Sequence, residues 1–278
     1  MSPVVITLIL CAALLHASWN AILRGGADRL WSITVMCATS AAVALPFVFF
    51  LPAPARASWP CIALSAALQI SYCLFLVRAY REGALAQVYP IARGTSPLLV
   101  TLGAVFVAGE RLTAAALGGV ALVSLGIMAL AFEKARPSAR STLAAVATGV
   151  FIAAYTLTDG AGARLSGHAQ SYTAWLFLVQ GSAMPLVYMA LRGRLSLPLK
   201  EAETWKALAG GVFGLLSYGV VIWALTLAPM GQVSALRETS ILFAAVIGVV
   251  FLKEKLTPAR VTAALMIAGG AVALSAAR

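Results

Sequence analysis

The sequence has few charged residues and very few of the titratable residues that enzymes use. Charged residues fill 10% of its 278 positions, with nine Asp and Glu and two His. A soluble domain averages about 25% charged residues. The two His lie in different halves of the chain, and neither an HExxH nor a Gly-x-Ser-x-Gly motif occurs. We therefore expect neither a soluble domain nor an enzyme.

Cysteine is also scarce. The four cysteines lie in apolar runs, and their spacing fits neither a disulfide framework nor a metal site. The pairs of glycines at 118–119, 210–211 and 269–270 are explained by close helix packing and predict no phosphate-binding loop. We expect no metal and no cofactor. The cysteines are Cys11, Cys37, Cys61 and Cys73.

Long apolar runs dominate the chain. Hydrophobic residues make up 62% of it, and the mean hydropathy is +0.95. A helix that spans a bilayer needs roughly 20 mostly apolar residues. The runs predict an all-α integral membrane protein with ten transmembrane helices. We place these helices near residues 3–23, 32–51, 60–80, 86–109, 112–132, 141–160, 170–191, 206–228, 231–252 and 258–276.

The chain contains an internal repeat. The stretch at 92–113, "ARGTSPLLVTLGAVFVAGERLT", is similar to "LRETSILFAAVIGVVFLKEKLT" at 236–257, 144 positions later. The pattern predicts two five-helix halves, residues 1–135 and 136–278. Because each half has an odd number of helices, the second half enters the membrane inverted, an arrangement that recurs in secondary transporters.

Basic residues are distributed unequally between the two ends of the predicted bundle. Fourteen Lys and Arg lie in the loops after the odd-numbered helices, four lie on the other side, and two lie within helices. By the positive-inside rule, the end with fourteen is cytoplasmic and both termini are outside. Since these residues are scattered between apolar runs, we expect a lipid bilayer as partner and no nucleic acid.

The paired hairpins "GERLT" at 109–113 and "KEKLT" at 253–257, with ten helices in two halves, resemble the EamA-type drug/metabolite transporter superfamily. The resemblance covers essentially the whole chain and, within the superfamily, is strongest to the amino-acid and metabolite exporters, among them the YddG-like aromatic amino-acid exporter branch. It implies a basket-like bundle around a central cavity, transport without ATP, and the bacterial inner (plasma) membrane. Family members often have both termini in the cytoplasm, which conflicts with the charge distribution. Pro97 matches a proline of the family, whereas Ile241 departs from it in the second copy.

Three charged residues interrupt the repeated stretches. Arg93, Arg237 and Glu238 fall about two turns into their predicted helices, where an ionisable group is costly and faces protein or a cavity. An Arg can bind a solute carboxylate bidentately, and Glu238 can bind an ammonium, pair with an Arg or exchange a proton. Snorkelling or an ion pair without contact to solute are the alternatives. We expect Glu238→Gln to change transport or its pH dependence and to leave folding intact.

Aromatic and polar side chains recur at helical spacing, so that they share helix faces. Such stripes fit a cavity for an amphipathic small molecule. The candidate solute-binding residues are His16, Trp19, Asn20, Tyr72, Tyr80, Tyr89, Arg93, Tyr155, Trp223, Arg237 and Glu238. The candidates for proton coupling are His16, Asp159 and Glu238. We expect Tyr172 to lie in the aromatic belt near the headgroups instead.

The function predicted from these features is secondary transport. We expect a monomer that exports a small organic solute, an amino acid or related metabolite, by alternating access. A channel or a lipid flippase on the same scaffold is the alternative, and an intramembrane enzyme is the least favoured one. Glu110 and Glu254 at the hairpins are interpreted as anchors or as members of a gating ion pair.

Overall fold

The computed structural model describes residues 1–81, 85–133, 138–252 and 257–276. These residues form helices and loops and no strand, and nine helices among them are long and apolar enough to span a membrane. The predicted all-α membrane fold is confirmed. The nine are α1 (Pro3–Gly25), α2 (Arg29–Ala44, continued by α3, Phe47–Phe50), α4 (Trp59–Arg81), α5 (Leu85–Ala108), α6 (Ala114–Ala129, continued by η2, Leu130–Phe132), α7 (Ala139–Leu165), α8 (Ala169–Arg192), α9 (Ala202–Leu227) and α12 (Pro258–Ala276).

The predicted helix at 231–252 is broken. It consists of α10 (Met230–Arg237) and α11 (Ser240–Leu252), separated by Glu238 and Thr239. At the break, the amide of Glu238 donates to the carbonyl of Ala235 and that of Thr239 to Leu236, so the chain tightens to i→i−3 bonds. The prediction of one continuous helix was wrong here. In membrane proteins such interruptions are tolerated where the backbone faces protein or a cavity.

A smaller correction concerns the second predicted helix, at 32–51. It begins at Arg29 and is interrupted after Ala44, and the chain continues as the short α3. Pro46 lies at this interruption, and proline cannot donate the backbone hydrogen bond that would continue the helix. The helix predicted at 141–160 is longer than expected and reaches Leu165.

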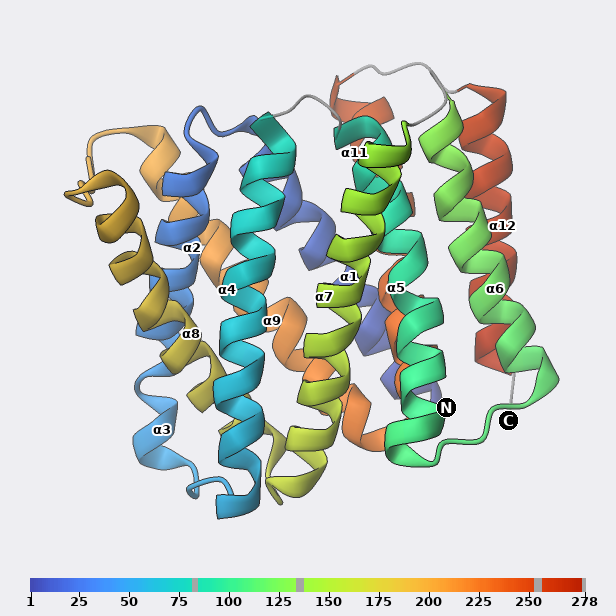
Figure 1. Ribbon diagram of the computed structural model, residues 1–278, viewed down its shortest axis with the longest axis horizontal. Coiled ribbons are helices and arrows are strands. Elements are labelled where there is room, and N and C mark those ends of the chain that lie inside the picture. The colour runs from blue at the N-terminus through green and yellow to red at the C-terminus, as the bar shows by residue number, and fades with distance from the viewer. Residues whose placement is uncertain (82–84, 134–137, 253–256, 277–278) are drawn as a thin grey trace.

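Helices of the two predicted halves pack against each other in corresponding pairs. In Figure 1, α1 and α7 run in opposite directions, and both termini lie at the same end of the bundle. The pair α1 and α9 corresponds to the pair α7 and α4, and both pairs are in contact. In addition, α6 packs on its counterpart α12, and α2 packs on its counterpart α8. Glycines permit the closest contacts of α2, because a Cβ at Gly181 or Gly211 would overlap the carbonyl of Cys37 or Met36. The division between residues 135 and 136 stays a prediction.

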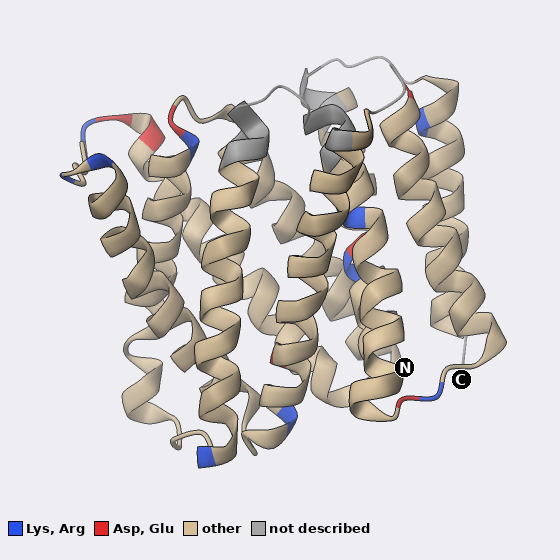
Figure 2. Ribbon diagram, in the orientation of Figure 1, with Lys and Arg blue, Asp and Glu red and all other residues tan. Residues whose placement is uncertain are grey.

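Threonine hydroxyls cap the first turns of two helices. The hydroxyl of Thr113 accepts from the amide of Ala116 at 3.3 Å, and that of Thr257 accepts from Arg260 at 3.3 Å. Both threonines therefore cap the helices that follow them. Figure 2 shows that the charged residues among those described lie mostly toward the two ends of the bundle, with few in the middle. Those few define the candidate site.

Candidate functional site

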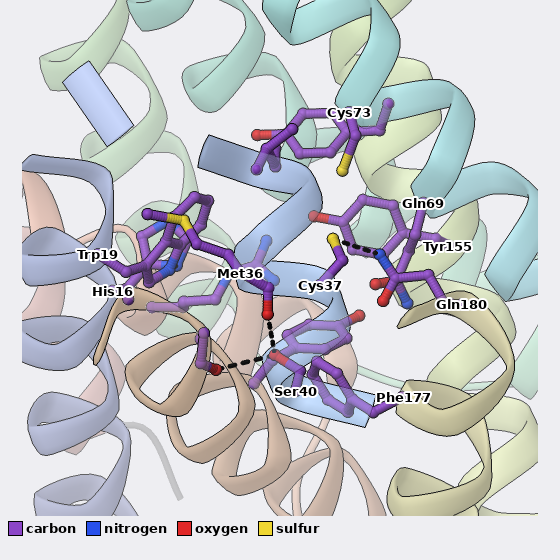
Figure 3. A pocket seen from close by; sticks show the side chains of 17 residues that line it. His16, Trp19, Met36, Cys37, Ser40, Gln69, Cys73, Tyr155, Phe177 and Gln180 are labelled. Carbon is purple, nitrogen blue, oxygen red and sulfur yellow. Dashed lines mark hydrogen bonds between the residues drawn. The ribbon is translucent and has the colours of Figure 1, made fainter. Parts of the chain in front are cut away.

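A cavity lies in the middle of the bundle (Figure 3). The cavity volume is about 110 Å³. By the same measure, a single water molecule needs roughly 10–15 Å³. A small solute with some water therefore fits. The wall is contributed by α1, α2, α4, α7, α8, α9 and α10, through His16, Trp19, Ile33, Met36, Cys37, Ser40, Gln69, Tyr72, Cys73, Tyr155, Phe177, Gln180, Gly210, Gly211, Gly214, Tyr218 and Arg237.

A charged cluster lies at the break between α10 and α11, beside this cavity. Nε of Arg93 approaches Oε2 of Glu238 to 2.7 Å, and Nη2 of Arg237 lies 3.6 Å from Oε1. Both contacts are ion pairs without hydrogen-bond geometry. A weak hydrogen bond of 3.4 Å joins Nη2 of Arg93 to the hydroxyl of Ser240. All three charged side chains are at most 1% exposed.

The break in the helix suits this cluster electrostatically. Arg237 is the last residue of α10, where the helix dipole places partial negative charge. Glu238 lies just before the first turn of α11, where the dipole is positive. The continuous helix α5 offers no such end at Arg93. The two copies of the repeat therefore hold their arginines in different backbone environments.

His16, Trp19 and Asn20 share one face of α1, as predicted. The indole Nε1 of Trp19 donates to Nδ1 of His16 at 3.2 Å, and the amide of Asn20 donates to the His16 carbonyl at 2.9 Å. The two rings meet edge to face at 5.1 Å. Nε2 of His16 is buried and has no hydrogen-bond partner among the described residues. Figure 3 shows His16 and Trp19 on one side of the view, and Gln69, Tyr155 and Gln180 on the other.

A buried carboxylate, Asp159 on α7, adjoins the cavity wall. Tyr172 donates to its Oδ1 at 2.9 Å, and Tyr218 and Gln69 donate to its Oδ2 at 2.6 Å and 3.3 Å. Asp159 is 0% exposed, and its partners are uncharged. The prediction that Tyr172 lies in the aromatic belt was wrong, because its ring is fully buried and its hydroxyl bonds to Asp159. Gln69 and Tyr218 connect this carboxylate to the cavity.

The predicted solute-binding residues divide into three groups. Those that line the cavity are His16, Trp19, Tyr72, Tyr155 and Arg237. Those that lie outside its lining are Asn20, Tyr89, Arg93, Trp223 and Glu238. Tyr89 belongs to the charged cluster, since the guanidinium of Arg93 lies 5.8 Å from its ring centre. The side chain of Tyr80 lies outside the described residues.

The sequence analysis missed several lining residues. Gln69 and Gln180 carry amide side chains within apolar helices, and such polar residues indicate a cavity in the same way as the charged residues do. The thiols of Cys37 and Cys73 and the hydroxyl of Ser40 carry no comparable signal, because small polar side chains are common in membrane helices. No group of three His, Cys, Asp or Glu in the described part of the chain is placed to hold a metal ion.

A second polar cluster lies at the end of the bundle that carries the termini. Nη2 of Arg164 lies 2.6 Å from Oε1 of Glu110, while Oε2 of Glu110 accepts from the amide of Met230, the first residue of α10. Arg164 also donates to the carbonyls of Leu225 and Ala228 at 2.9 Å and 3.2 Å. The predicted ionic role of Glu110 is thus with Arg164, far along the chain. We call these two residues the Glu110–Arg164 clamp.

The second half of the chain is similar to a known protein family. Residues 140–276 match the EamA-like transporter family. These residues form an EamA-like transporter domain. The EamA-like domain contains α8, α9, α10, α11 and α12 and all but the first residue of α7, and thus includes Asp159, Arg237 and Glu238. The match of these residues indicates a membrane transporter of small solutes.

The whole chain, including the part before the EamA-like domain, shares its fold with a solved structure. That structure, described only as the crystal structure of a protein, aligns with a TM-score of 0.75 at 21% identity over 98% of this chain and 96% of its own. At this identity the likeness shows the fold alone. The comparison with curated proteins gives no match.

Proposed function

We propose that the protein is a secondary transporter that exports a small organic solute, an amino acid or related metabolite, by alternating access. The observation that carries the proposal is the central cavity, whose wall combines α1, α2 and α4 of the first half with α7, α8, α9 and α10 of the second. A site between two inverted halves is exposed alternately when one half rocks against the other. The EamA-like domain supports transport over enzymatic chemistry.

The two ends of the bundle support a cycle of this kind. The lining of the cavity extends to Ile33, in the second turn of α2 from the end with the basic loops. At the opposite end, the Glu110–Arg164 clamp ties the loop after α5 to α7, α9 and α10. We propose that this structure is closed at the end with the termini and that the clamp breaks when that end opens.

The chemistry of the wall supports an aromatic or apolar solute. Tyr72, Tyr155, Phe177 and Tyr218 form part of it, and the rings of Tyr72 and Tyr155 and of Tyr155 and Tyr218 lie 5.8 Å apart. Such a wall is compatible with the YddG-like aromatic amino-acid exporter branch and with a place in the bacterial inner membrane, which we propose on that resemblance. Among the three candidates for proton coupling, we propose Asp159.

The proposal is tested by efflux from proteoliposomes preloaded with the twenty amino acids, read by mass spectrometry with and without a pH gradient. Selective and saturable loss of a few members, inhibited by competing solutes, is the expected result. Flux that does not saturate would indicate a channel. No loss above empty liposomes, together with scrambling of labelled phospholipid, would replace the proposal with a flippase.

The clamp gives a separate prediction about access. In Glu110→Gln, the ion pair to Arg164 is lost, and a hydrogen bond to a charged group is typically worth about 1.5–3 kcal/mol. We expect Cys37, which lines the cavity, to react about tenfold faster with a membrane-impermeant maleimide from the end with the termini. The measurement uses vesicles of both orientations, with the other three cysteines replaced by Ser.

Arg192→Gln is the matched control for the clamp variant. Arg192 pairs with Asp28 at 3.8 Å, and both side chains are more than 40% exposed, so this pair contributes little. Its labelling rate should equal that of the parent protein. An equal rate in Glu110→Gln and the parent from both sides would show that the clamp does not limit access.

A further inference from the structure

We infer that the cavity holds its solute by a carboxylate group, which binds jointly to Arg237 on α10 and His16 on α1. The inference rests on the transport function proposed above and names the chemical class of solute that this site takes. Both residues line the cavity, and each carries at least one buried nitrogen atom for which the described residues provide no hydrogen-bond acceptor. The solute would be a small monocarboxylate with an apolar or aromatic body.

Arg237 has unused hydrogen-bond donors. Its side chain is 1% exposed, yet Nε and Nη2 have no hydrogen-bond partner in the described structure. Its contacts are Oε1 of Glu238 at 3.6 Å and the ring of Tyr218, whose centre lies 5.8 Å from the guanidinium carbon. A buried donor without an acceptor costs free energy. A planar carboxylate matches the guanidinium fork and would satisfy both nitrogens.

The charges of the cluster leave Arg237 without full compensation. Glu238 is the only acidic residue that forms an ion pair with Arg93 or Arg237 among the described residues, and Arg93 holds it at 2.7 Å against 3.6 Å for Arg237. Two guanidinium groups therefore share one carboxylate. Asp159 does not correct this, since three uncharged donors surround it and it forms no ion pair in the described structure. A bound anion restores the balance at Arg237.

His16 supplies a second donor toward the same space. Because the indole of Trp19 donates to Nδ1 at 3.2 Å, Nδ1 acts as an acceptor, and the proton of the neutral imidazole is assigned to Nε2. Nε2 is buried, and no residue in the described part of the chain accepts a hydrogen bond from it. Trp19 therefore acts as a positioning residue that fixes the His16 tautomer. A carboxylate oxygen is the acceptor that this N–H lacks.

The remaining wall offers no ionised group for an ammonium. None of the described residues that line the cavity is Asp or Glu. The carboxylate, not the amino group, is then the group on which recognition depends, and removing the amino group should leave binding largely intact. The rings of Tyr155 and Phe177 offer apolar area to the body of the solute.

The test compares solutes that differ in one group. The probes are phenylalanine, 3-phenylpropanoate and phenylalaninamide, with leucine, 4-methylpentanoate and leucinamide as an aliphatic set. Binding to the full chain in detergent is read from the ligand-dependent shift of its melting temperature. We expect each amide to bind about 100-fold more weakly than its two acids, as for a lost partner of a buried charge.

Variants assign the preference to the two residues. Arg237→Gln should bind acid and amide equally, and Arg237→Lys, which keeps the charge without the fork, should recover part of the difference. His16→Phe should weaken the acids about tenfold, as for one charge-assisted hydrogen bond, and His16→Gln, which keeps an N–H donor, should weaken them less. Arg192→Gln, at an exposed ion pair, should match the parent protein.

The outcomes separate this inference from the proposed function. Equal binding of acids and amides by the parent protein, or an acid preference that survives in Arg237→Gln, would overturn the carboxylate site even if efflux occurs. Failure of efflux for every solute in the mixture would overturn transport, while a selective shift by the acids would uphold the site. Monodisperse elution of each variant shows that a loss of binding is not a loss of folding.

Discussion

Glu238→Gln is expected to lower the free energy of unfolding by about 3–5 kcal/mol, the range for breaking a buried ion pair from one side. The carboxylate lies between Arg93 and Arg237, and all three side chains are at most 1% exposed. An uncharged Gln leaves two guanidinium groups in the protein interior without their shared counter-charge. Unfolding in mixed detergent–SDS micelles measures the change.

The two arginine variants provide the comparison. Arg237→Gln keeps the ion pair of 2.7 Å between Arg93 and Glu238 and removes the less compensated charge, so its stability should stay close to that of the parent protein. Arg93→Gln removes the shorter of the two ion pairs of Glu238, so the free energy of unfolding of this variant should lie between those of Glu238→Gln and Arg237→Gln. The sequence alone suggested that Glu238→Gln leaves folding intact, and the burial of the cluster changes that expectation. Equal stability of Glu238→Gln and the parent protein would contradict the expectation that this variant is destabilised.

Asp159→Asn is expected to abolish the response of transport to a pH gradient. Asp159 is a buried carboxylate that forms no ion pair in the described structure, whereas Glu238 forms ion pairs with two arginines. A proton on Oδ2 would need an acceptor, but Tyr218 and Gln69 both donate to that atom. Protonation at Oδ2 therefore requires a change in the hydrogen bonds of Tyr218 and Gln69, both of which line the cavity. Asn resembles the protonated acid in shape and charge and cannot release a proton.

Several groups surround Asp159 and bear on this pH dependence. The polar and titratable groups that interact with it are Gln69, Ser65 and Cys61 on α4, Tyr155 on α7, Tyr172 on α8, Tyr218 on α9 and Arg237 on α10. Since the tyrosines and the arginine keep their protonation near neutral pH, Asp159 is the group expected to change.

Efflux from proteoliposomes with and without a pH gradient measures the response. Linked binding sites typically share a coupling free energy of about 1–3 kcal/mol, and this coupling should vanish in Asp159→Asn while exchange at equal pH persists. His16→Gln is the parallel variant, because His16 is the predicted proton-coupling residue that lines the cavity, and its Nε2 is buried without a hydrogen-bond partner in the described structure. Loss of the response in His16→Gln and its survival in Asp159→Asn would transfer the proton site to His16.

Most of the helices could be predicted because the length of an apolar run carries the information. Residues 258–276 form α12 with the predicted bounds, and the predicted helix at 86–109 differs from α5 by one residue at each end. The break at Glu238 and Thr239 could not be predicted. Helix α5 contains Pro90 and Pro97 and is continuous, whereas the corresponding α10 and α11 contain no proline and are separated by a break. Local sequence therefore does not account for the break, and we attribute it to tertiary contacts.

The candidate site was visible from the sequence only in part. Arg93, Arg237 and Glu238 attract notice because charge is rare in apolar runs. The sequence does not predict which of these residues form ion pairs, because periodicity assigns a residue to a helix face but does not identify the helix that packs against that face. The same limit explains Tyr172, whose hydroxyl finds Asp159 on a neighbouring helix, and Glu110, whose partner Arg164 is 54 positions away.

The shortness of α10 has a mechanical consequence. Its first residue, Met230, donates its amide to Glu110 of the clamp, and its last residue, Arg237, reaches the cavity. At a rise of 1.5 Å per residue, the eight residues form a rod about 12 Å long. Because a hydrogen-bonded helix of two turns does not stretch, displacement of one end is carried to the other. The Glu110–Arg164 clamp and the cavity are thus joined by a single rigid element, and a displacement of Arg237 at the cavity is transmitted to the clamp.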